Sequence, residues 1–315
     1  MFRKFLLILF IFTVIISCEK EISVDLPLPK DQIVVEGFIE NDVPPYVFLT
    51  KNSPYFGEVD INDLDQYFVK GAKIIVSTGT DSVELMEYSA DIINLLPEEE
   101  KQMLSEVFGV PLDTSMNFPN ISIYTVPLGV DFVGVIGKTY DLRIEAEGKL
   151  LTATTYIPHG IAFSKLWVEP HPNPIYDTLV QLRGILKDPD TLGNFYRYFT
   201  KKNSQPYTLI NQSVFDDLIY NGKEFPIDIP YGFERNSDVD FDFKTFGYWN
   251  IKDTCYIKLC MIDRAHYNFW RTLENELANQ GSPFGSFTRI RSNINGGIGI
   301  WGGYSSSMGI YYPEE

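Results

Sequence analysis

The sequence has few of the residues that most often carry enzyme chemistry. Histidine occurs only at His159, His171 and His266, and their positions do not match the spacing of a zinc motif such as H-E-x-x-H. The G-x-S-x-G turn that presents a serine nucleophile is also missing. We therefore expect a protein that is not an enzyme of these classes and that holds no cofactor.

Basic residues are scarce compared with acidic ones. The chain has 26 lysines and arginines against 42 aspartates and glutamates, which gives a formal net charge of −16 at pH 7. A surface this acidic repels the phosphates of nucleic acids and of anionic lipids. The composition therefore argues against a nucleic-acid partner.

Long hydrophobic runs are missing beyond the amino terminus. Arg3 and Lys4 precede an apolar run from Phe5 to Ile16, which is interrupted only by Thr13. A membrane-spanning helix needs about 20 apolar residues, whereas a short run after positive charges is typical of a secretory signal. We interpret residues 1–17 as a signal peptide that is removed.

The end of that run resembles the lipobox of bacterial lipoproteins. An aliphatic pair and a small residue, Ile15, Ile16 and Ser17, stand directly before Cys18. The resemblance implies that Cys18 becomes the lipidated first residue, so acyl chains would attach the protein to the membrane. Residues 18–30 then form a tether. Its acidic start, Glu19 to Glu21, is similar to an export signal for the exterior of the outer membrane.

Only two other cysteines remain, Cys255 and Cys260. An offset of five in a strand places their side chains on opposite faces, and the length of the strand separates them too far for a disulfide unless the strand bends. We interpret both as small buried hydrophobic residues, with a disulfide as the alternative.

The first half of the mature chain has the patterns of β-strands. Strands are expected at 33–39, 46–50 and 71–77, and a hairpin at 139–146 and 149–156 with Glu147 and Gly148 at its turn. In the hairpin, alternate residues from Tyr140 to Ala146 would share one buried face. A short capped helix is expected from Pro97 to Phe108.

The second half repeats these β patterns and adds one stronger helix. Strands are expected at 179–186, 194–199 and 255–262. A helix is expected from Arg264 to Gln280, with Asp263 as its N-cap. Its apolar stripe, through Phe269 or Trp270, Leu273 and Leu277, is expected to pack on a sheet. We place a domain boundary at residue 158 and predict a mainly β fold. The second domain, 159–315, would be a β-rich sandwich or barrel-like domain with one or two short helices.

Two segments are candidate binding sites. Asp238, Asp240 and Asp242 alternate as carboxylates on one side of a strand would, which suits a hard cation such as Ca²⁺, although a solvated strand face is the preferred interpretation. The glycine-rich segment near the carboxyl terminus is the second candidate, either as a binding edge or as a place of close strand packing. Its candidate residues are Asn293, Gly296, Gly297, Gly299, Trp301 and Tyr304.

The order of these landmarks resembles a family of Bacteroidota lipoproteins, family 4249 of the domain-of-unknown-function series. The matching segments are 18–21, 34–37, 44–47, 71–74, 140–142, 152–158, 267–273 and 292–304. The resemblance implies an immunoglobulin-like β-sandwich over residues 31–158 and a β-rich domain after it. It also implies company with a TonB-dependent transporter, a β-barrel of the outer membrane.

These features favour an accessory or binding lipoprotein of the outer membrane that is not an enzyme and faces the cell exterior. Two alternatives stay open. One is a surface hydrolase that acts through a carboxylate pair, because more than forty acidic residues offer many pairs. The other is an adhesin or structural envelope protein, which would need an exposed apolar patch.

Overall fold

The computed structural model of the chain describes residues 32–52, 66–97, 101, 122–210, 212–232, 242–279 and 288–313. The expected signal peptide, Cys18, the tether and most of the expected helix at 97–108 lie outside these residues. Residues 31–315 form one compact unit. Their structure is mainly β and sandwich-like, which confirms the predicted fold class.

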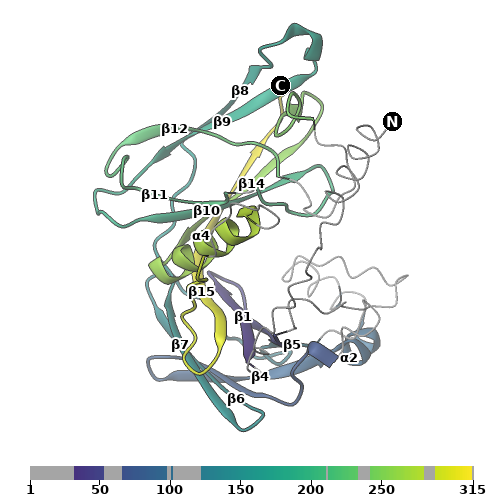
Figure 1. Cartoon of the computed structure of the whole chain (residues 1–315), viewed down its shortest axis with the longest axis vertical. Coiled ribbons are helices and arrows are strands. Elements are labelled where there is room, and N and C mark those ends of the chain that lie inside the picture. The colour runs from purple at the N-terminus through teal and green to yellow at the C-terminus, as the bar shows by residue number, and fades with distance from the viewer. Residues whose placement is uncertain are drawn as a thin grey trace, which may run out of the picture. The chain divides into compact units, whose positions relative to one another are not determined.

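The principal element is an eleven-stranded sheet (Figure 1). Its strands run in the order β11-β10-β14-β15-β1-β2-β5-β4-β3-β6-β7. Their bounds in chain order are β1 Ile33–Glu40, β2 Tyr46–Lys51, β3 Lys73–Thr78, β4 Asp81–Ser89, β5 Ser122–Thr125, β6 Thr139–Ala146, β7 Lys149–Tyr156, β10 Phe195–Lys202, β11 Val214–Asp216, β14 Cys255–Ile262 and β15 Ile298–Tyr311.

A second, four-stranded sheet is built around β9. It contains β8 Lys165–Pro170, β9 Leu179–Lys187, β12 Glu224–Asp228 and β13 Trp249–Asn250. The helical elements of the described chain are α2 Ala90–Leu95, the short 3-10 helix η2 Pro174–Tyr176, and α4 Arg264–Asn279. None of the helices in these described ranges is long and apolar enough to cross a membrane.

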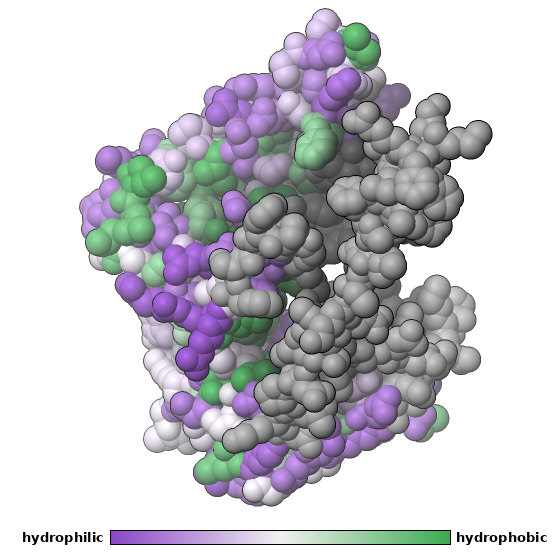
Figure 2. Space-filling model, in the orientation of Figure 1, coloured by the Kyte–Doolittle hydropathy of each residue, from purple (hydrophilic) through white to green (hydrophobic). Residues whose placement is uncertain are grey.

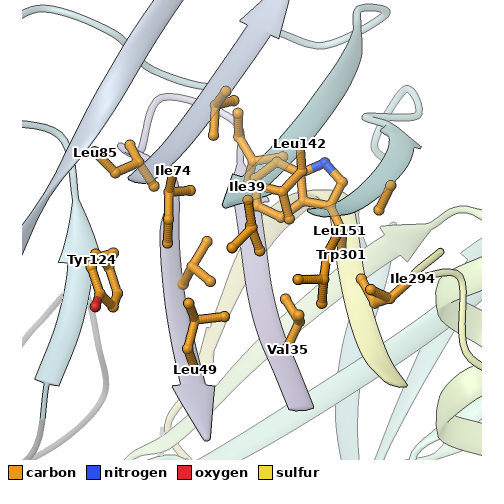
Figure 3. Packing of buried hydrophobic residues seen from close by; sticks show 14 of the residues in the cluster. Val35, Ile39, Leu49, Ile74, Leu85, Tyr124, Leu142, Leu151, Ile294 and Trp301 are labelled. Carbon is orange, nitrogen blue, oxygen red and sulfur yellow. The ribbon is translucent and has the colours of Figure 1, made fainter. Parts of the chain in front are cut away.

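The first hydrophobic core forms as the sequence alternation predicts. Tyr140, Leu142, Ile144 and Ala146 are all buried on one face of β6. They pack with residues of β1 to β4 and with Trp301 (Figure 3). The hairpin between β6 and β7 is also confirmed, with Gly148 at a φ of +71° in its turn.

The carboxyl-terminal strand β15 returns to the first half of the chain. It pairs in parallel with β1, from Val34 opposite Ile298 to Glu40 opposite Tyr304, and antiparallel with β14 on its other edge. The predicted boundary at residue 158 falls between β7 and β8. Each side of it has its own core, but one sheet runs through both. The division into domains stays a prediction.

Around β14 the large sheet is covered on both faces. Alternate residues from Cys255 to Met261 pack with the small sheet, whereas Cys260 and Ile262 point to the opposite face, where α4 lies. Both thiols are free and buried, on opposite faces, as the offset of five predicted.

Helix α4 confirms the predicted helix. Asp263 caps it, because the Oδ1 atom of Asp263 accepts a hydrogen bond from the backbone N–H of His266 at 2.7 Å. The predicted apolar stripe is only partly correct: Phe269 is buried, but Leu277 is 38% exposed. Glu274, on the same helix, is buried instead.

Figure 2 shows the surface in the orientation of Figure 1. The described residues on this face are largely hydrophilic, with smaller apolar patches.

Candidate functional site

A cavity of about 210 Å³ lies between α4 and five neighbouring strands of the large sheet. The five strands, β10, β14, β15, β1 and β2, are consecutive in the sheet. We call this site the arginine cavity. Its walls are formed by Glu36, Phe38, Tyr46, Arg197, Phe199, Leu209, Cys260, Ile262, His266, Trp270 and Tyr304.

The sheet register explains why distant residues meet here. Arg197 is paired with Cys260 across β10 and β14, and Ile262 is paired with Tyr304 across β14 and β15. Residues directly opposite each other in neighbouring strands project to the same face. Pairing of β1 with β15 then brings the residues of the first strand to this face as well.

Arg197 is the charged residue at the centre of the cavity. It is only 4% exposed. Its guanidinium lies close to two aromatic rings, 3.6 Å from the ring centroid of Trp270 and 4.8 Å from that of Phe199. Its Nε–H donates to the Oγ of Ser213 at 3.0 Å. Within the described ranges this is the one hydrogen bond of the guanidinium, so both Nη groups lack a hydrogen-bond partner.

Ser213 links this arginine to a buried carboxylate. The Oγ–H and the backbone N–H of Ser213 donate to the carboxylate of Glu274 at 2.5 and 3.0 Å. Burial lowers the pKa of Arg197 to about 10, and the charge of Glu274 acts in the opposite direction. Arg197 therefore stays charged at neutral pH, with Glu274 as a buried counter-charge.

His266 lies in the cavity wall, over the position in β15 where Gly302 has no side chain to obstruct the imidazole ring. A Cβ atom on Gly302 would stand 2.7 Å from Nδ1 of His266, so glycine at this position gives the ring its place. The Nδ1 atom lies 3.5 Å from the carbonyl oxygen of Gly303. Burial, with the nearby charge of Arg197, lowers the pKa of His266 to about 3. The imidazole is therefore neutral, and its buried Nε2 has no hydrogen-bond partner.

The depressed pKa of His266 predicts an acid-sensitive fold. Between pH 6.5 and 3 the unfolded chain binds a proton at this residue that the folded protein does not bind. The free energy of unfolding should therefore fall as pH falls, by about 1.4 kcal/mol for each unit below pH 6.5. Urea unfolding of His266→Asn, which has no titratable group there, should show a shallower decline between pH 6.5 and 5. Equal slopes would contradict the prediction.

Trp270 is the one tryptophan in the described chain whose indole N–H has no acceptor. The other three indoles donate hydrogen bonds, from Trp167 to Glu169, from Trp249 to Ile229 and from Trp301 to Tyr140. The Nε1 atom of Trp270 is buried and its side chain lines the cavity. Buried polar groups without a partner are uncommon and indicate a ligand or ordered water.

Two tyrosines and a glutamate form the polar end of the cavity. The side chains of Tyr46 and Tyr304 are hydrogen-bonded to each other, and Tyr304 is also hydrogen-bonded to Glu40. Glu40 accepts from the Nζ of Lys258 at 2.6 Å and from Ser306. Burial raises the pKa of both tyrosines. Both phenols therefore keep their protons at neutral pH.

Glu36 contributes a carboxylate at the open side of the cavity. Its side chain is exposed, in contrast to the buried Arg197. Desolvation of the carboxylate by the surrounding protein still raises its pKa, and the charge of Arg197 acts in the opposite direction. The cavity thus offers a buried cation and, nearer to solvent, an anion.

The structure gives the glycine-rich candidate segment a packing role. A Cβ atom would lie 1.9 Å from the carbonyl oxygen of Val35 if placed on Gly299, and 2.8 Å from that of Ile33 if placed on Gly297. On Gly296 it would lie 2.4 Å from the carbonyl oxygen of Leu150. The close approach of the β1 and β7 backbones therefore requires these glycines.

The other candidates in the segment divide between core and cavity. The side chain of Asn293 donates to the carbonyl of Trp301 at 2.8 Å and accepts from its N–H at 2.9 Å, so it replaces a strand partner. Trp301 is fully buried in the first core. Tyr304 alone of the six lines the arginine cavity. A binding role for the segment stays a prediction.

The acidic candidate segment falls largely outside the described residues, which include Asp242 but not Asp238 and Asp240. Asp242 begins a turn, because its Oδ1 accepts from the backbone N–H of Lys244 at 3.0 Å. No group of three or more potential metal ligands occurs among the residues that the structure describes. A cation site at the three aspartates stays a prediction.

The arginine cavity was not predicted from the sequence. One signal was available: Arg197 is a lone charge between aromatic residues, in a strand whose residues from Phe195 to Tyr198 are all buried. A charge inside such a strand must find partners in the core. The roles of Glu274, Trp270 and Ser213 had no comparable local signal, because each depends on contacts between distant elements.

Comparison with models of protein families identifies the family of this chain. The family model described as "Domain of unknown function (DUF4249)" matches residues 19–309. The chain belongs to this family. No curated protein matches the chain. The DUF4249 match begins directly after Cys18 and contains every residue of the arginine cavity, from Glu36 to Tyr304.

Proposed function

We propose that this DUF4249 protein is a binding module of the bacterial outer membrane, not an enzyme, which holds a small ligand in the arginine cavity. The observation that carries the binding role is a cavity lined by two buried polar atoms without a hydrogen-bond partner, Nε2 of His266 and Nε1 of Trp270, beside the Nη groups of the buried Arg197. A cavity walled by aromatic rings with a few polar groups is typical of ligand sites.

The membrane attachment in this proposal depends on Cys18. The short apolar run that ends at this cysteine supports a lipid anchor, and several acyl chains hold a protein at a membrane stably. The acidic residues after Cys18 support an outer-membrane position that faces the exterior.

The anchor can be tested by one substitution. Cys18→Ser should abolish labelling of the protein by an alkyne analogue of palmitate and should remove it from the membrane fraction. Cys255→Ala, a change at a buried free thiol, is the matched control and should stay labelled. Persistence of the Cys18→Ser protein in the membrane with its label would contradict the anchor.

The partner in this proposal is a TonB-dependent outer-membrane β-barrel, to which the module would present its ligand. The support is the family resemblance and the expected position in the outer membrane. Mild cross-linking followed by affinity purification from solubilised outer membranes should recover such a barrel. As a control, a known complex of the outer membrane should be cross-linked and recovered in the same experiment. Recovery of this protein alone, while the control complex is recovered, would contradict the partnership.

The hydrolase alternative requires two carboxylates at one cleft. Among the described residues that form the arginine cavity, one has a carboxylate, Glu36. Glu40 stands behind Tyr304, where Lys258 and Ser306 occupy its oxygens. The geometry therefore supports binding better than hydrolysis.

A further inference from the structure

The arginine cavity presents hydrogen-bond donors at its buried end. The two Nη groups of Arg197 have no partner in the described chain, and neither does the indole N–H of Trp270. The guanidinium contacts the rings of Trp270 and Phe199, and its Nε–H is hydrogen-bonded to Ser213. Its Nη edge is therefore the part left for a ligand, and a planar carboxylate matches this edge with two parallel hydrogen bonds.

The same cavity presents acceptors away from that edge. His266 is 2% exposed and neutral, and its Nδ1 faces the carbonyl of Gly303, so the proton on Nδ1 leaves Nε2 as an acceptor. That Nε2 has no partner. Glu36 adds a carboxylate at the open side. A ligand that satisfies these atoms must itself carry hydrogen-bond donors, and a positive charge suits Glu36 best.

The remaining walls are apolar and the space is small. Phe38, Phe199, Leu209 and Ile262 line it, together with Tyr46 and Trp270. A volume of about 210 Å³ suits a molecule of the size of one amino acid. These walls contribute binding free energy through apolar contact and exclude water from the guanidinium of Arg197.

We infer that the arginine cavity binds a free α-amino acid with an apolar side chain. Its carboxylate lies on the Nη edge of Arg197 and accepts a hydrogen bond from the indole N–H of Trp270. Its ammonium group lies toward Glu36 and the Nε2 of His266. The side chain packs against the aromatic walls. This inference rests on the proposed binding function and names the ligand class. A neutral sugar could stack on the same rings, but it would leave the two opposite charges without matching groups.

Isothermal titration calorimetry of the mature protein with L-leucine tests the inference. Two analogues separate the contributions of the charged groups: 4-methylpentanoate lacks the ammonium, and L-leucinol lacks the carboxylate. We expect L-leucine to bind and each analogue to bind at least about tenfold more weakly, since a hydrogen bond to a charged group contributes that much affinity or more. Absence of L-leucine binding, or equal affinity for L-leucinol, would overturn the inference. So would tighter binding of D-glucose.

Variants of the cavity extend the test. Trp270→Phe keeps a ring beside the guanidinium and removes only the N–H, and should weaken L-leucine binding about tenfold. Trp167→Phe, which changes an indole on β8 outside the cavity, should bind as the unchanged protein does. Glu36→Gln should weaken L-leucine binding and leave 4-methylpentanoate binding unchanged. If both tryptophan variants bind equally, the assigned carboxylate position is wrong.

The result of the L-leucine titration does not depend on the membrane partner. Recovery of a β-barrel by cross-linking tests the proposed function without an added amino acid. If the barrel is recovered and L-leucine does not bind, the ligand class is wrong and the proposed partnership stands. If L-leucine binds and the barrel is not recovered, the partnership fails and the ligand site stands.

Discussion

Gly299→Ala should destabilise the protein by about 3 to 5 kcal/mol, from backbone strain and overpacking together, and this is the largest effect that we expect from a single methyl group. Gly299 has a φ of +118°, where residues with a side chain are strained. A Cβ atom there would also lie 1.9 Å from the carbonyl oxygen of Val35. The backbones of β1 and β15 would have to separate at this point, which breaks the parallel pairing that joins both halves of the chain.

Urea unfolding followed by circular dichroism measures this effect. Gly129→Ala is a matched control, because Gly129 has a φ of +83° but no heavy atom within 4 Å of the added Cβ. The control isolates backbone strain and should cost about 1 to 2 kcal/mol. If both variants lose the same stability, the close contact between β1 and β15 is not as described.

Glu274→Ala should destabilise the protein by about 3 to 5 kcal/mol, the range for a buried charge network that loses one member. The substitution removes the acceptor of two hydrogen bonds from Ser213. It also leaves Arg197, which is 4% exposed, without its buried counter-charge. The measurement is again the free energy of unfolding in urea.

Glu224→Ala, a change at an exposed position of β12, is the control for Glu274→Ala and should change stability by less than about 0.5 kcal/mol. A double-mutant cycle with Arg197→Met then separates the loss of the counter-charge from the loss of packing. The double variant should be less destabilised than the sum of the two single variants, because no unpaired charge stays buried. Simple additivity would show that Arg197 and Glu274 do not interact.

The local elements of the fold could be predicted because their information lies in neighbouring residues. The alternation from Tyr140 to Ala146 defines one buried face of β6, and Gly148 defines the turn that follows. Asp263 defines the start of α4. In each case the pattern repeats within a few residues and reflects the geometry of one strand or helix.

The pairing of distant segments could not be predicted in this way. Val35 and Gly299 are paired in parallel although most of the chain separates them, and no local pattern indicates which strand accepts β15. The glycines near Gly299 did indicate that another backbone approaches, since this was one of the two interpretations of the segment. They did not identify β1 as that backbone.

The arginine cavity was missed for the same reason. Its residues come from five strands, one helix and, for Leu209, the connection between β10 and β11, and they meet only after the sheet register is set. Trp270 illustrates the difficulty: its helical spacing predicted packing, and it does pack on Arg197, but its unpartnered indole N–H is visible only in the structure. Glu274 had no apolar pattern to mark it as buried.

The central claim is that the arginine cavity holds a carboxylate ligand, and the indole signals of the protein test it most directly. In a two-dimensional NMR spectrum of protein with ¹⁵N-labelled tryptophan, Trp270→Phe assigns the signal of interest by its disappearance. Addition of L-leucine should shift the Trp270 indole signal downfield as its N–H gains an acceptor. The signals of Trp249 and Trp301, already bonded to Ile229 and Tyr140, should stay in place. A Trp270 signal that does not move at saturating L-leucine would contradict the account.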